Sequence, residues 1–193
     1  MIDFLYSIDL SILYFFNHTL AWGFLDKFFS TITDKHAWYI AYIILIGILL
    51  TKGEKKGRLA VLGIIILIAI SDQTGNLIKN SLQRIRPCNA LDDVRKIIGC
   101  AGGFSFPSNH AVNNFAAATF FYKLYPNLKI PLFVAAFLVA LSRIYLGVHY
   151  PSDMIGGIII GFSIGYIFAL GFLKLLEYIN TIGSKTKKVK NAD

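Results

Sequence analysis

Three short strings of the chain combine cations, hydroxyl groups and imidazoles beside apolar sequence. They are residues 79–87 (Lys-Asn-Ser-Leu-Gln-Arg-Ile-Arg-Pro), 107–110 (Pro-Ser-Asn-His) and 142–153 (Ser-Arg-Ile-Tyr-Leu-Gly-Val-His-Tyr-Pro-Ser-Asp). Ionisable groups next to membrane-like sequence are costly, and functional by default. Together the strings supply cations for a phosphate, histidines for a nucleophile and an acid, and a carboxylate to orient one histidine.

In the first string, Lys79 and Arg86 are seven residues apart, close to two turns of an α-helix, so we expect them to share one helix face, about 10 Å apart along the axis. Pro87 disfavours helical backbone at Arg86, so we expect the helix to end there and to release the guanidinium. Arginine binds phosphate through a planar pair of donors, and lysine binds it as a point charge. Lys79, Arg84 and Arg86 would equally fit as basic residues that reach the interface from a helix end.

The second string places Ser108 as the N-cap of an apolar stretch. The amino terminus of a helix offers free N–H groups and a positive dipole end, and both favour a phosphate. His110 would then be placed to protonate a leaving oxygen. Alternatively, the string is a plain helix cap followed by a packed histidine.

In the third string, Arg143 precedes His149 by six residues and Asp153 follows it by four. An imidazole attacks phosphorus only through an unprotonated nitrogen, and a carboxylate on its other nitrogen fixes that tautomer. The simpler alternative is that Ser152 and Asp153 only cap the last helix.

Composition points to the bilayer. The chain has 193 residues, of which 55% are hydrophobic and 16% are charged, whereas soluble domains carry about 25% charged residues. We predict an all-α, polytopic membrane helical bundle rather than a soluble α-protein. The apolar stretches expected to span the membrane are 36–52, 58–79, 109–123, 129–143 and 153–174.

These stretches predict a catalytic transmembrane bundle over residues 36–178. Residues 1–35 precede it in the sequence as an N-terminal interfacial or short spanning segment. Leu10 to Leu25 is short for a span, so it would cross as a sixth helix or lie in the interface. Asp3 and Asp9 stand where a signal peptide would be basic, so we expect no cleavable signal. Residues 179–193 are predicted to form a basic cytoplasmic tail.

If the five stretches alternate across the membrane, all three strings fall on one face. The opposite face receives the basic residues Lys52, Lys55, Lys56, Arg58, Lys123, Lys129 and those from Lys174 through Lys190. By the positive-inside tendency that second face is cytoplasmic. The net charge of +8 therefore indicates membrane orientation, and we expect no nucleic-acid partner.

The three strings resemble the signature motifs of the phosphatidic acid phosphatase type 2 superfamily, which is related to vanadium haloperoxidases. The match runs in order from Lys79 to Asp153, and departs only at Asn109, where the family usually has glycine. The resemblance implies a six-helix bundle in which His149 forms a phosphohistidine, Asp153 orients His149 and His110 acts as acid and then base. By the same resemblance no metal or other cofactor is needed, and the phosphate is bound by Lys79, Arg86, Ser108, Asn109 and Arg143.

The expected function is therefore a metal-independent lipid phosphatase of the bacterial inner membrane, with its active site facing the periplasm. Its partners would be the bilayer and a lipid with a phosphate headgroup, with no obligate protein partner. Lipid A 1-phosphate and undecaprenyl diphosphate are the leading substrates. Alternatives are a phosphatidic acid or phosphatidylglycerophosphate phosphatase and, in another class, a phospholipid transporter with a phosphate-binding vestibule.

The only cysteines, Cys88 and Cys100, both fall between the first and second strings. An oxidising exterior would permit a disulfide there, and closing a loop of about 13 residues would contribute roughly 3 kcal/mol in the chain-entropy model. Two buried free thiols are the alternative.

Overall fold

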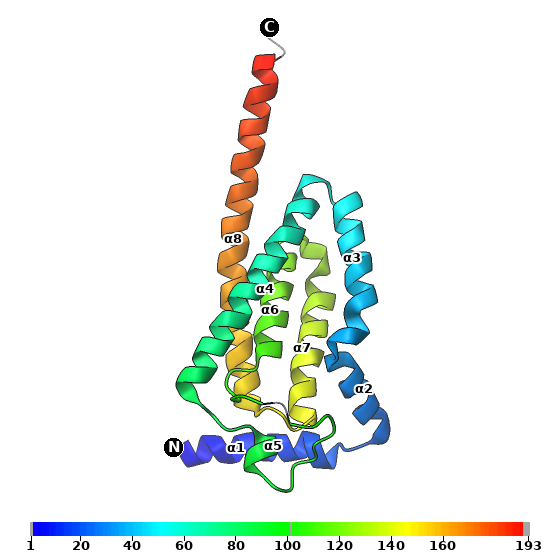
Figure 1. Ribbon diagram of the computed structural model, residues 1–193, viewed down its shortest axis with the longest axis vertical. Coiled ribbons are helices and arrows are strands. Elements are labelled where there is room, and N and C mark those ends of the chain that lie inside the picture. The colour runs from blue at the N-terminus through cyan, green and yellow to red at the C-terminus, as the bar shows by residue number, and fades with distance from the viewer. Residues whose placement is uncertain (1, 101, 191–193) are drawn as a thin grey trace.

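The computed structural model describes residues 2–100 and 102–190, with side chains for 4–100 and 102–182. All its regular elements are helical (Figure 1). In chain order they are α1 (Ile2–Tyr14), the π-helical turn η1 (Phe15–Thr19), α2 (Gly23–Thr33), the 3₁₀ turn η2 (Lys35–Trp38), α3 (Tyr39–Thr51), α4 (Glu54–Leu82), α5 (Pro87–Ala90), α6 (Asn109–Leu124), the 3₁₀ turn η3 (Pro126–Leu128), α7 (Lys129–Tyr145) and α8 (Pro151–Lys190).

The predicted all-α class is confirmed, and each of the five apolar stretches lies in helix. In chain order they fall in η2 with α3, in α4, in α6, in α7 and in α8. Among the described residues, three segments are long and apolar enough to cross a bilayer: Glu54–Ala90, Pro126–Tyr145 and Pro151–Ile182. A fourth is the pair Gly23–Thr33 and Lys35–Thr51, if this pair, bent by 68°, counts as one span.

Helix α6 occupies the centre of the bundle, because α4, α7 and α8 all pack against its sixteen residues. Its closest neighbour is α8, which presents a stripe of glycines at every fourth position, Gly157, Gly161 and Gly165. A side chain at Gly161 or Gly165 would collide with the backbone of α6. Small residues at such spacing let two membrane helices approach closely. This contact fixes the amino ends of α6 and α8 relative to each other.

Helices α1 and α2, with the turn η1 between them, pack against the end of the bundle that carries the three strings. Residues 10–25 do not form one helix, because they are divided among α1, η1 and α2. Helix α1 lies across the lower end of the bundle in Figure 1. The fully buried Asn17 secures the segment that follows: its amide donates to the carbonyl of Tyr145 at 2.7 Å, and its oxygen accepts from the N–H of Arg95 at 2.8 Å.

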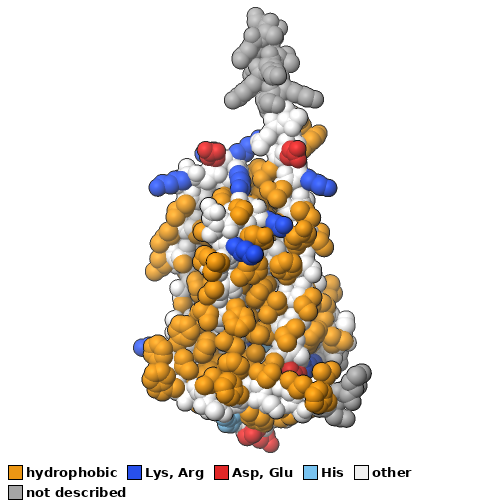
Figure 2. Space-filling view, turned by 180° about the vertical axis from the view of Figure 1, so that it is seen from behind, with side chains coloured by type: hydrophobic (Ala, Val, Ile, Leu, Met, Phe, Trp, Pro, Cys, Tyr) orange, Lys and Arg blue, Asp and Glu red, His pale blue; other side chains and the backbone are white. Residues whose placement is uncertain are grey.

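The two ends of the bundle differ in charge. The carboxyl ends of α4 and α7 and the amino ends of α6 and α8 meet near α1 (Figure 1), so the three strings share one end, as alternation predicts. Figure 2 shows an apolar surface over the bundle, with most of the visible lysine and arginine side chains gathered toward its other end. Helix α8 continues through Lys190 without a break at 179, and the side chains of the predicted tail beyond residue 182 lie outside the described residues.

Cys88 and Cys100 are joined by a disulfide in the structure, with Cα atoms 5.8 Å apart. In protein extracted without reductant and then denatured, we expect neither cysteine to react with an alkylating reagent, as read by mass spectrometry. Reduction before alkylation is the control and should expose both thiols. The Cys88→Ser/Cys100→Ser variant should lose roughly 3 kcal/mol of unfolding free energy by the chain-entropy estimate. Two alkylated cysteines in the unreduced sample would contradict the bridge.

Candidate active site

His149 lies in the loop between α7 and α8 and is only 2% exposed. Its Nδ1 is 3.3 Å from Oδ2 of Asp153, and its Nε2 is 2.9 Å from Nη1 of Arg86. Because a guanidinium only donates, Nε2 must accept and the ring proton must sit on Nδ1, facing the carboxylate. Burial lowers the pKa of His149 to about 3, so the imidazole is neutral near pH 7. The unprotonated Nε2 is the nitrogen that nucleophilic attack requires.

Asp153, in the first turn of α8, is fully buried, and hydrogen bonds fix both of its carboxylate oxygens. Oδ2 accepts from the N–H of Tyr150 at 2.8 Å and from the hydroxyl of Ser105 at 2.5 Å. Oδ1 accepts from Nη1 of Arg84 at 2.7 Å. The carboxylate that orients His149 is therefore itself held in one orientation.

The backbone around Arg86 differs from the expectation. Helix α4 ends at Leu82, four residues before Arg86, because Gln83 adopts a left-handed conformation with φ of 50°. Arg86 is extended and precedes α5, whose first residue is Pro87, so the effect predicted for this proline is present. The expectation that Lys79 and Arg86 would lie on one helix was wrong. An extended segment brings Arg86 to His149 instead.

Lys79 is buried on α4, 8% exposed, and points into the loop that precedes α6. Its Nζ donates to the carbonyl oxygens of Phe104 at 2.9 Å, Ser105 at 3.0 Å and Pro107 at 2.5 Å. An ammonium group has three donors, and these carbonyls match all of them. Lys79 therefore holds the backbone of the loop that leads into the second string.

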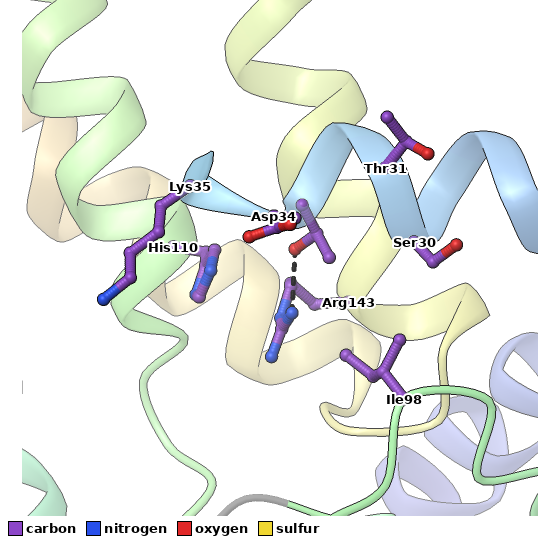
Figure 3. Close-up of a pocket in the computed structure, with 8 residues that line it drawn as sticks. Ser30, Thr31, Asp34, Lys35, Ile98, His110 and Arg143 are labelled. Carbon is purple, nitrogen blue, oxygen red and sulfur yellow. Dashed lines mark hydrogen bonds between the residues drawn. The ribbon is translucent and has the colours of Figure 1, made fainter. Parts of the chain in front are cut away.

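Arg143 and His110 share a cavity of about 570 Å³ with polar residues of α2 and η2 (Figure 3). The lining residues are Ser30, Thr31, Thr33, Asp34, Lys35, Ile98, His110 and Arg143. Arg143 is 6% exposed, and its Nη1 donates to Oγ1 of Thr33 at 2.8 Å. Its Nε has no partner among the described residues. A buried guanidinium with an unmatched donor in a cavity is suited to bind an anion.

Ser108 is the N-cap residue of α6, as predicted, but its hydroxyl makes no capping hydrogen bond. That hydroxyl is buried without a partner among the described residues. The side chain of Asn109 turns away to α4, where its amide donates to Oδ1 of Asp72 at 3.0 Å and to Oδ1 of Asn76 at 2.8 Å. Ser108 therefore has a free hydroxyl, whereas the Asn109 side chain contacts α4 and leaves only its backbone N–H at the helix end.

Three further side chains hold residues of the site in place, and the sequence analysis assigned no role in the site to them. Arg84 and Ser105 contact Asp153, and Thr33 contacts Arg143. Arg84 carried a signal, because it is a cation beside a membrane helix. Ser105 and Thr33 carried none, since hydroxyl residues are ordinary in loops and at helix ends.

A helical membrane bundle that gathers a histidine–carboxylate pair and buried cations at one end is the arrangement expected of an enzyme acting on phosphate groups. The chain belongs to the PAP2 superfamily, whose family model matches residues 59–176.

The relatives agree with this membership. The chain is 36% identical to a lipid A 4′-phosphatase of Bacteroides thetaiotaomicron, over 87% of this chain and 78% of that one. Among solved structures, Aquifex aeolicus LpxE matches with a TM-score of 0.65 and 27% identity, covering 82% of this chain and 93% of that one. The Bacillus subtilis PAP2-type phosphatidylglycerolphosphate phosphatase matches with a TM-score of 0.63 and 25% identity, covering 91% and 87%.

Proposed function

We propose that this protein is a lipid phosphatase that uses His149 as its nucleophile. The observation that carries this proposal is the pair of contacts on the imidazole, with Asp153 on Nδ1 and Arg86 on Nε2. The ring is neutral, its tautomer is fixed, and a cation that can attract a phosphate lies beside Nε2. These are the conditions for nucleophilic attack of Nε2 on phosphorus. The family membership and the phosphatase relatives support the same reaction.

In the proposed first step, Nε2 of His149 bonds to phosphorus as the bond from phosphorus to the lipid oxygen breaks. His110 gives its proton to that oxygen, and Asp153 offsets the positive charge that forms on the imidazole. In the second step, His110 takes a proton from water, whose oxygen attacks phosphorus and breaks the N–P bond. Inorganic phosphate leaves, and both histidines return to their starting states.

For the phosphate itself, we propose that Arg86, Arg143 and Ser108 are the binding side chains. The two guanidinium groups would offset the charge that develops on the equatorial oxygens. The N–H groups at the start of α6, including that of Asn109, would add the helix-end contribution. Lys79 would not contact the phosphate but would hold the loop before α6 in place, through hydrogen bonds to its carbonyls. Cations in these places supply what Mg²⁺ supplies in many phosphoryl-transfer sites.

As substrate we propose a phosphate of lipid A. The similarity to a lipid A 4′-phosphatase extends over 87% of the chain, whereas that to an undecaprenyl-diphosphatase covers 39% of it. This favours lipid A over undecaprenyl diphosphate, and similarity to lipid A 1-phosphatases leaves the 1- and 4′-positions both to be tested. The structural match to a phosphatidylglycerolphosphate phosphatase favours a glycerophospholipid phosphate as the second candidate. A transporter with a phosphate-binding vestibule would need the cations, but it would have no use for the His149–Asp153 pair.

Phosphate release by the purified protein tests this function. The lipids to compare are lipid A with phosphate at position 1, at position 4′ or at both, undecaprenyl diphosphate, phosphatidylglycerophosphate and phosphatidic acid. We expect turnover of a lipid A phosphate to exceed that of the other lipids by at least about tenfold in kcat/KM, a difference of 1.4 kcal/mol in transition-state binding. Movement of lipid between leaflets without phosphate release would instead identify a transporter.

Activity should survive EDTA, and vanadate should inhibit competitively. Both expectations follow from a site in which arginines and a helix end hold the phosphate, because vanadate would occupy the same place. The measurement is phosphate release from the preferred lipid after chelation and dialysis, with a vanadate titration at several lipid concentrations. Loss of activity on chelation, with recovery on addition of Mg²⁺, would refute the proposed cation-only mechanism.

We further propose that the protein lies in a bacterial inner membrane with this site facing the periplasm. Support comes from the basic residues at the opposite end of the bundle, including Lys52, Lys55, Arg58 and Lys129, which are exposed. Because disulfides persist in oxidising compartments, the alkylation experiment on Cys88 and Cys100 also tests this orientation.

A further inference from the structure

A chain of charged groups links the N-terminal helix to the carboxylate that orients His149. Arg84 stands between two acids, with Nη1 at 2.7 Å from Oδ1 of Asp153 and Nη2 at 2.8 Å from Oδ2 of Asp9. Asp9, on α1, is 6% exposed and Asp153 is fully buried, whereas the Arg84 side chain is 28% exposed. Two buried carboxylates that are distant in sequence therefore share one partly exposed cation. Removing Arg84 would leave the buried charge of Asp153 without the cation that compensates Oδ1, and an uncompensated buried charge is destabilising.

Further contacts fix this group in place. The guanidinium of Arg84 lies over the ring of Tyr150 at 4.0 Å from its centroid. Asp9 accepts hydrogen bonds from the backbone N–H of Ser152 at 2.8 Å and from the hydroxyl of the same residue at 2.5 Å. These bonds attach helix α1 to the first turn of α8. Asp153 belongs to the same turn, two residues after the helix begins.

Arg84 is not placed to bind the phosphate. Its Nη1 donates to Ser152 and Asp153 and its Nη2 donates to Asp9, while Tyr150 covers one face of the guanidinium. Its effect on the reaction must pass through Asp153.

We propose that Arg84 and Asp9 are positioning residues for hydrolysis. Arg84 holds Oδ1 of Asp153, so that Oδ2 stays directed at Nδ1 of His149, and Asp9 holds Arg84. The helix that lies across the end of the bundle is therefore part of the catalytic apparatus. This inference rests on the proposed phosphatase function.

The test measures kcat and KM for phosphate release from one lipid, for Arg84→Gln, Arg84→Lys and Asp9→Asn. Loss of a charged hydrogen bond to Asp153 should lower kcat by about tenfold to a hundredfold for Arg84→Gln, and by less for Asp9→Asn. KM should stay within about twofold, since no contact with substrate is removed. Arg84→Lys should recover part of the lost kcat, because it retains the cation without the two-armed geometry.

A second arm places the same changes in an Asp153→Asn background. If Arg84 acts through Asp153, then Arg84→Gln should lower kcat there by less than about twofold, because coupled residues are not additive. The control is Arg95→Gln, which breaks the 2.6 Å ion pair with Asp26 at the same end of the molecule, away from Asp153. It should leave kcat near that of the parent, and melting temperatures of all variants show whether a loss of rate merely follows a loss of fold.

Three changes in the kinetics would overturn the inference. They are an increase in KM at unchanged kcat, a full additional loss in the Asp153→Asn background, and an equal loss of kcat in Arg95→Gln. Unchanged kinetics of the Arg84 and Asp9 variants would refute it as well. In each case turnover by the parent leaves the proposed function standing, whereas a parent that releases phosphate from no lipid refutes the function itself.

Discussion

His149→Ala is expected to lower phosphate release by about a thousandfold or more, because no other group at the site replaces a nucleophile. Binding of the lipid should change little, since Arg86, Arg143 and Ser108 remain. The measurement is the rate of phosphate release, together with trapping of radiolabelled phosphate on the protein after rapid quenching at alkaline pH. Parent protein should carry acid-labile phosphate, and the variant should carry none.

A matched control for this variant is His18→Ala. His18 lies on η1, is exposed and belongs to none of the three strings. We expect it to retain the parent rate, which would show that removal of an imidazole as such is not harmful. Retention of more than a small fraction of activity by His149→Ala, or labelled phosphate on that variant, would refute the role proposed for His149.

His110→Ala should produce the second largest loss, and the loss should depend on the leaving group. General acid catalysis contributes about a hundredfold to ten-thousandfold where the leaving oxygen is a poor leaving group, as in an alkyl or sugar phosphate. An aryl phosphate ester leaves without help, so its rate of phosphoenzyme formation should fall far less. Rapid-quench measurement of phosphoenzyme from both kinds of ester gives the comparison. Equal losses for the two esters would exclude His110 as the acid.

The bundle could be predicted because its determinants are local. Apolar stretches ended by polar turns predict helices, and their alternation across a membrane predicts that the three strings meet at one end. The position of Ser108 before α6 followed from helix capping in the same way. None of these inferences needed knowledge of which residue touches which.

Contacts between distant segments were beyond this reasoning. Lys79 points at a loop rather than outward because the carbonyls of residues 104, 105 and 107 converge on it, and no spacing rule describes that loop. The end of α4 at Leu82 depends on a left-handed Gln83, a residue without a strong preference for that conformation. Asp9 is 75 positions from Arg84, and nothing in an apolar amino-terminal stretch identifies its partner.

The departure of Asn109 from the glycine usual at its position has a counterpart on α4. Its carboxamide fits against Gly75, where any side chain would collide with it, and donates to Asp72 and Asn76. Among related chains, positions 75 and 109 should therefore vary together. Where position 109 is glycine, the position of Gly75 is free to become larger, so a lineage that exchanged one without the other would pass through a poorly packed intermediate.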